Sequence, residues 1–67
     1  MQPSELEQVT PEWTEIRTDD HPGRRYLVLR VEAREDTTIL HCRDKANDAY
    51  YSFYAEECTI TRRKGPK

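Results

Sequence analysis

The fold of this 67-residue chain is decided by the stretch Tyr26-Leu27-Val28-Leu29-Arg30-Val31-Glu32-Ala33. Its odd-numbered positions are all apolar, whereas its even-numbered positions include the charged residues Arg30 and Glu32. Alternation with a period of two predicts a β-strand that turns one face toward a core. We therefore expect the odd-numbered side chains in the core and the even-numbered ones, from Tyr26 onward, on the opposite face.

Four further segments have the composition of strands. Residues 37–44 alternate in the same way, Tyr50–Tyr54 is rich in aromatic residues, and Cys58–Arg62 alternates as well. A shorter strand is expected over residues 13–18. The stretch after it, residues 19–23, predicts a type II turn, because Pro22 presets φ and Gly23 permits a positive φ.

The turns between these segments predict how the strands pair. A two-residue hairpin loop at Glu35 and Asp36 would pair Val31 with Leu40 and Leu29 with Cys42. A four-residue loop over residues 45–48, with Asn47 in a left-handed conformation, would pair Cys42 with Tyr51. The two hairpins then share one apolar face. Glu-Asp lacks the glycine that a tight hairpin turn prefers, so a longer loop or a bulge at the first turn is the alternative.

The expected fold is all-β, with four to five antiparallel strands. Residues 55–57 fit one 3₁₀ turn, and a final strand can return to the first. This order resembles the SH3-like small β-barrels over residues 24–62, which implies a fold and no functional residue. A helix over residues 46–57 and an OB-like barrel are the alternatives. The predicted core consists of Ile16, Leu27, Leu29, Val31, Leu40, Cys42, Tyr51, Phe53, Cys58 and Ile60.

The domain organisation follows from charge and length. Residues 1–11 are expected to form a flexible acidic arm, residues 12–62 the barrel domain, and residues 63–67 a disordered basic tail. Six acidic residues and one arginine lie in residues 1–23, and ten basic against seven acidic residues follow. The chain has no apolar run long enough to span a membrane and no signal peptide, so a cytoplasmic protein is expected.

Enzymatic and metal-binding motifs are weak. His41 and Cys42 are adjacent on a predicted strand and point to opposite faces, which is a poor zinc-ligand spacing. Cys42 and Cys58 are expected to be buried, reduced thiols rather than a disulfide. Only two glycines are present, and Asp19-Asp20-His21 fits turn chemistry. We expect no metal, no cofactor and no catalytic activity.

The face opposite the predicted core carries the candidate partner-binding residues. Tyrosine and arginine side chains with scattered aliphatic ones are typical of protein interfaces. The predicted function is a non-catalytic protein-binding module, a small bacterial or phage accessory protein that inhibits or recruits a larger partner. The alternative is a barrel that binds RNA or single-stranded DNA, which the net charge of −2 disfavours. The candidate residues are Tyr26, Arg30, Ile39, His41, Arg43, Tyr50 and Tyr54.

Two further expectations concern this face. A strongly curled barrel could bury part of both faces, or Tyr26 and Val28 could pack beneath the N-terminal arm and Trp13. Charged residues flank the final strand and discourage pairing between strand edges, so a monomer or weak homodimer is expected.

Overall fold

The computed structural model describes residues 3–62, which form one antiparallel sheet of five strands. The strands are β1 (Glu15–Thr18), β2 (Tyr26–Ala33), β3 (Thr38–Asp44), β4 (Tyr50–Tyr54) and β5 (Cys58–Arg62). A helical turn, α1 (Pro3–Leu6), precedes them, and the expected 3₁₀ turn, η1 (Ala55–Glu57), separates β4 from β5. The all-β prediction is confirmed, and the helix considered for residues 46–57 is wrong.

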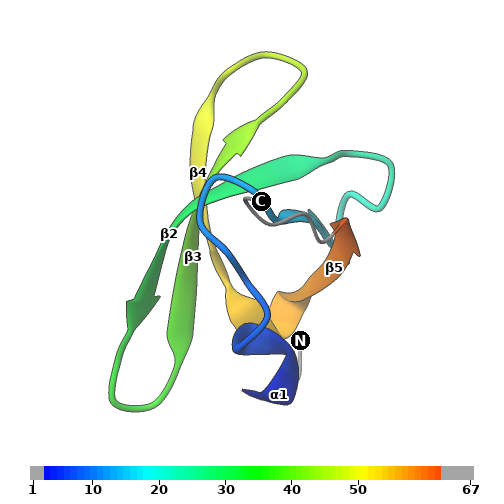
Figure 1. The fold of residues 1–67 in the computed structure, drawn as a ribbon. Coiled ribbons are helices and arrows are strands. Elements are labelled where there is room, and N and C mark those ends of the chain that lie inside the picture. Colours follow the sequence, from blue (N-terminus) through cyan, green and yellow to red (C-terminus); the bar gives the residue numbers. More distant parts are fainter. Residues whose placement is uncertain (1–2, 63–67) are drawn as a thin grey trace.

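The strand order is β4-β3-β2-β1-β5 (Figure 1). The last strand returns to the first, since Thr18 pairs with Cys58 and Ile16 with Ile60. Within residues 3–62 the outer strands β4 and β5 do not pair with each other, so the sheet is open where a barrel would be closed. Residues 63–67, predicted as a basic tail, lie outside the described residues.

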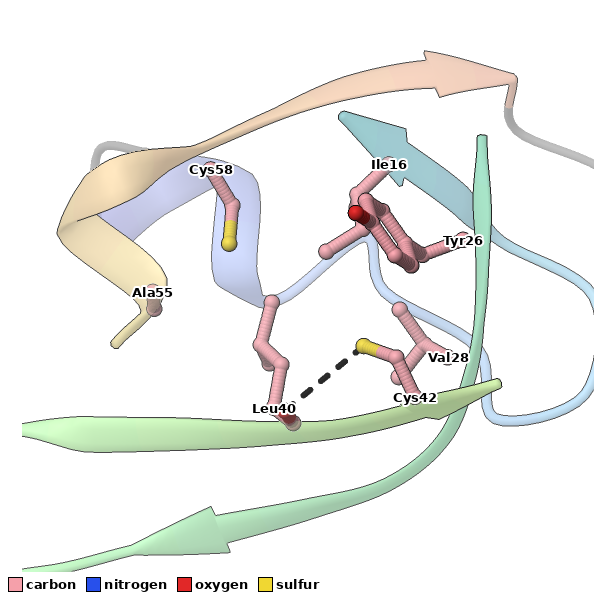
Figure 2. Packing of buried hydrophobic residues seen from close by; sticks show 7 residues of the cluster. All are labelled: Ile16, Tyr26, Val28, Leu40, Cys42, Ala55 and Cys58. Carbon is pink, nitrogen blue, oxygen red and sulfur yellow. Dashed lines mark hydrogen bonds between the residues drawn. The ribbon is translucent and has the colours of Figure 1, made fainter. Parts of the chain in front are cut away.

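The core lies on the concave side of this sheet. Leu6 and Val9 of the N-terminal segment pack against it from outside the strands. Figure 2 shows the converging side chains, which come from β1, β2, β3, β5 and η1. The buried hydrophobic residues are Ile16, Tyr26, Val28, Leu40, Cys42, Ala55 and Cys58.

The pairing of β2 with β3 corrects the predicted core. Val31 pairs with Leu40 as predicted, but Cys42 pairs with Val28 and not with Leu29. Leu29 is the extra residue of a β-bulge, which reverses the inward and outward positions on its N-terminal side. Tyr26 and Val28 are therefore buried, whereas Leu27 and Leu29, predicted in the core, are partly exposed. The bulge lies within the strand, away from the turn where a bulge was considered.

The pairing of β3 with β4 is as predicted, with Cys42 opposite Tyr51. Asp44 organises the loop between them: its Oδ1 accepts the Ala46 N–H at 2.8 Å, and its backbone N–H donates to the Ala49 carbonyl at 2.8 Å. The left-handed residue is Asp48, with φ of 60°, and not Asn47.

The connection from β1 to β2 differs from the predicted type II turn. The Arg24 N–H donates to the His21 carbonyl at 3.1 Å, so Pro22 and Gly23 are the central residues of a turn. Gly23 does not have a positive φ, which a type II turn requires at this position. Among residues 3–62, no helix has the length and apolar character needed to cross a membrane.

Candidate functional site

Six of the seven predicted partner-binding residues lie on the convex side of strands β2, β3 and β4. Strand pairing places Arg30 beside His41, Arg43 beside Tyr50, and Ile39 beside Tyr54. Glu32 and Ser52 lie on the same side of the sheet, because Glu32 pairs with Ile39 and Ser52 pairs with His41. We call this surface the outer face; it consists of Arg30, Glu32, Ile39, His41, Arg43, Tyr50, Ser52 and Tyr54.

Tyr26 is the predicted residue that the outer face lacks. The bulge turns it inward, where only 2% of its surface is exposed. Its ring makes edge contacts with the rings of Phe53 and Tyr51, at centroid distances of 4.8 and 5.8 Å. Burial raises the pKa of the Tyr26 hydroxyl, the Asp44 carboxylate raises it further, and the Arg24 guanidinium acts in the opposite direction.

A shallow hollow of about 470 Å³ lies on the outer face. Arg30, His41 and Ser52 line it together with Leu29, the bulge residue. Tyr50, at one end of β4, also lines the hollow and is 75% exposed, and Tyr54, at the other end, is 50% exposed. Sequence reasoning missed Leu29 here because it assigned that side chain to the core.

A row of polar side chains crosses the outer face from β2 to β4. The two ring nitrogens of His41 lie 2.9 Å from Ser52 Oγ and 2.9 Å from Glu32 Oε1. Glu32 Oε2 also accepts a hydrogen bond from Arg34 Nε at 2.6 Å. The hydrogen bonds from His41 and then Arg34 lower the pKa of the Glu32 carboxyl. The row therefore fixes the imidazole on the surface of the sheet.

The same three groups, a hydroxyl, an imidazole and a carboxylate, occur together in nucleophilic active sites. In this row Nδ1 of His41 faces Ser52 and Nε2 faces Glu32. The hydroxyl donates to Nδ1 only in the tautomer in which Nε2 carries the proton. Nucleophilic chemistry also requires donors for a developing oxyanion and a site that excludes water, and Ser52 is exposed.

The basic side chains around the outer face are paired with acids. Arg34 and Arg30 face Glu32, at 2.6 and 3.9 Å, and Arg43 Nε lies 3.7 Å from Asp48 Oδ1. Elsewhere on the domain, Arg24 pairs with the buried Asp44, and Lys45 and Arg62 both face Glu15. The face therefore presents aromatic and hydrogen-bonding groups more than an uncompensated positive charge.

The cysteines are buried free thiols, as predicted, and belong to the core. Burial raises the pKa of Cys42 to about 12 and that of Cys58 to about 11. Across residues 3–62, no three histidine, cysteine, aspartate or glutamate side chains are close enough to hold a metal ion. No protein-family model, curated protein or solved structure matches this chain.

Proposed function

We propose that this chain is a non-catalytic protein-binding module that inhibits or recruits a larger partner through its outer face. The observation that carries this proposal is the pair of exposed tyrosines, Tyr50 and Tyr54, at the two ends of β4, together with the hollow that Tyr50 lines. Tyrosine offers large, rigid contact area and a polar hydroxyl, and it is enriched among the residues that dominate binding energy.

The strand order and the position of η1 support an SH3-like barrel as the finer description of the fold. The outer face is held rigid by the Glu32–His41–Ser52 row, because each hydrogen bond joins neighbouring strands. A rigid surface loses little conformational entropy when a partner binds.

A protein partner is favoured over RNA or single-stranded DNA by the charge pairing. Phosphate binding requires Lys or Arg side chains that are free to replace the counterions condensed on the phosphate backbone. Arg30 and Arg34 already face Glu32, and Arg43 faces Asp48. A nucleic acid would have to displace these carboxylates or bind against them.

The test is partner capture with matched variants. Tagged chain is used as bait in extract of the source cell, and the retained protein is then titrated against purified variants. Tyr50→Ala and Tyr54→Ala are each expected to weaken binding, and a central contact would cost on the order of 30-fold in affinity. Trp13→Ala is the control, because Trp13 is an exposed aromatic residue outside the outer face.

Two results would contradict the proposal. In the first, both tyrosine variants bind the partner as tightly as the unmodified chain while Trp13→Ala does not. In the second, labelled oligonucleotides bind at low salt and their affinity falls steeply as salt rises, which identifies a nucleic-acid-binding barrel.

A further inference from the structure

A second concave surface lies on the other side of β4, and sequence reasoning did not anticipate it. It is a groove of about 340 Å³ between β4, the β1–β2 loop and η1. The Asp19 N–H donates to the Glu57 carbonyl at 3.1 Å and joins the loop to η1. We call it the loop groove; its lining is Thr18, Asp19, Asp20, His21, Arg24, Tyr26, Tyr51, Phe53 and Glu57.

One wall of the loop groove is aromatic. The rings of Tyr51 and Phe53 are stacked, with planes 15° apart and centroids 5.9 Å apart. Tyr26 stands against both in edge contacts. Tyr51 is 39% exposed because the sheet is open beside the edge strand β4. Exposed aromatic faces attract cations through the ring quadrupole.

Three of the other residues that line the groove are acidic. Asp19, Asp20 and Glu57 all line the loop groove. Within residues 3–62 none of the three forms an ion pair, whereas Arg24, the cation that lines the groove, is paired with Asp44 at 3.1 Å. The groove therefore combines ring faces with carboxylates that have no partner in the described part of the chain.

We propose that the loop groove binds a single cationic side chain, a lysine or an arginine, from a partner chain. The aromatic wall would contact the cation, and the Asp19, Asp20 and Glu57 carboxylates would neutralise it. The groove's volume is near the lower end for small-molecule pockets, about 300 Å³, which suits one side chain. This site is separate from the outer face, since the two hollows share only Tyr51.

The test is a nuclear magnetic resonance titration of the isotope-labelled chain with blocked tripeptides. Their central residue is lysine, arginine or, as the uncharged control, glutamine. Lysine and arginine peptides are expected to give saturable shifts confined to the amides around Thr18–Asp20, Tyr51 and Glu57, and the glutamine peptide none.

Charge variants at exposed positions separate the site from a general attraction of cations. The double variant Asp19→Asn/Asp20→Asn is expected to weaken binding roughly fivefold or more, because each exposed ion pair contributes a modest amount. The control Glu35→Gln/Asp36→Asn makes the same change of net charge in the β2–β3 turn and is expected to leave affinity unchanged. The amide spectrum of each variant verifies its fold.

Three results would overturn the proposal: no saturable shift with either cationic peptide, equal shifts with the glutamine peptide, or equal losses in both double variants. The peptide titration tests the loop groove separately from the proposed function. Tyr50→Ala alters the outer face and is expected to leave peptide binding unchanged.

Discussion

The bulge at Leu29 makes opposite predictions for two adjacent apolar residues. With the bulge, Val28 is fully buried against the core and Leu27 is partly exposed. Without it, Leu27 would face the core and Val28 the solvent. Val28→Ala and Leu27→Ala therefore test the register of β2 directly, since only one of the two side chains can be a core residue.

The magnitudes follow from burial. Val28→Ala removes two methyl groups from a site with 0% exposure. At about 0.8 kcal/mol for each buried group, the transfer loss is about 1.6 kcal/mol, and an incompletely filled cavity raises the total to about 2.5 kcal/mol. Leu27→Ala removes more atoms but from a partly exposed site, and is expected to cost no more than about 1 kcal/mol. Val28→Ala would lower the melting temperature by roughly 10–20 °C.

Urea unfolding gives the free energies, and the fluorescence of Trp13, the single tryptophan, reports the transition. Circular dichroism of the folded state controls for a change of structure in the variants. Equal losses in the two variants, or a larger loss in Leu27→Ala, would refute the bulged register. The assignment of Leu29 to the outer hollow would then fail as well.

Three further predictions concern charge and protonation. Asp44→Asn keeps an acceptor for the Ala46 N–H but loses the ion pair with the half-exposed Arg24, so it is expected to lower the free energy of unfolding by about 1 kcal/mol. Asp44→Ala loses both contacts and is expected to lower it by about 3 kcal/mol. Urea unfolding measures both values. The pKa of Glu32 is lowered on folding, so its contribution to stability is present above its ordinary value of 4.5 and is lost as pH falls through the folded value. Glu32→Gln should lower the urea midpoint at pH 7 but not at pH 2, and equal losses at both would contradict this. The raised pKa values of Cys42 and Cys58, about 12 and about 11, mean that stability is full below the ordinary thiol value of 9.0 and falls as pH rises from there toward 11. The Cys42→Ala/Cys58→Ala variant should show a weaker alkaline dependence in thermal melts, and an unchanged slope would argue against buried thiols.

Much of the sheet was predictable because its signals are local. The strands, the 3₁₀ turn and the return of β5 to β1 follow from alternation and turn composition. The β3–β4 register could be predicted because a shift by one residue would have moved Leu40 and Cys42 out of the core. That register also brought Arg43 beside Tyr50 and Ile39 beside Tyr54, which is why most of the outer face was identified.

The bulge could not be predicted because Leu27, Val28 and Leu29 are consecutive apolar residues. Whether the odd-numbered or the even-numbered side chains point inward, the inward face is apolar over these three positions. Hydrophobic alternation therefore does not distinguish the two registers. The inward frame depends on how the strand bends, because the bulge allows β2 to pair with β1 at Tyr26 and still follow β3 beyond Arg30. The loop groove depends on the path of residues 19–25 and on an open sheet edge, which no local pattern encodes.

The position of the bulge also divides the sheet into two parts that differ in how firmly their amides are held. β1 pairs with β2 only at Tyr26 and Leu27, so within residues 3–62 the strand beyond Leu29 has β3 on one side and no strand on the other. That half of β2, with the turn at residues 34–37, can open without disturbing the ladder that joins β1, β5 and the first half of β2. We expect its amide hydrogens to exchange with solvent well before those of Ile16 and Val28, as a separate unit of local unfolding.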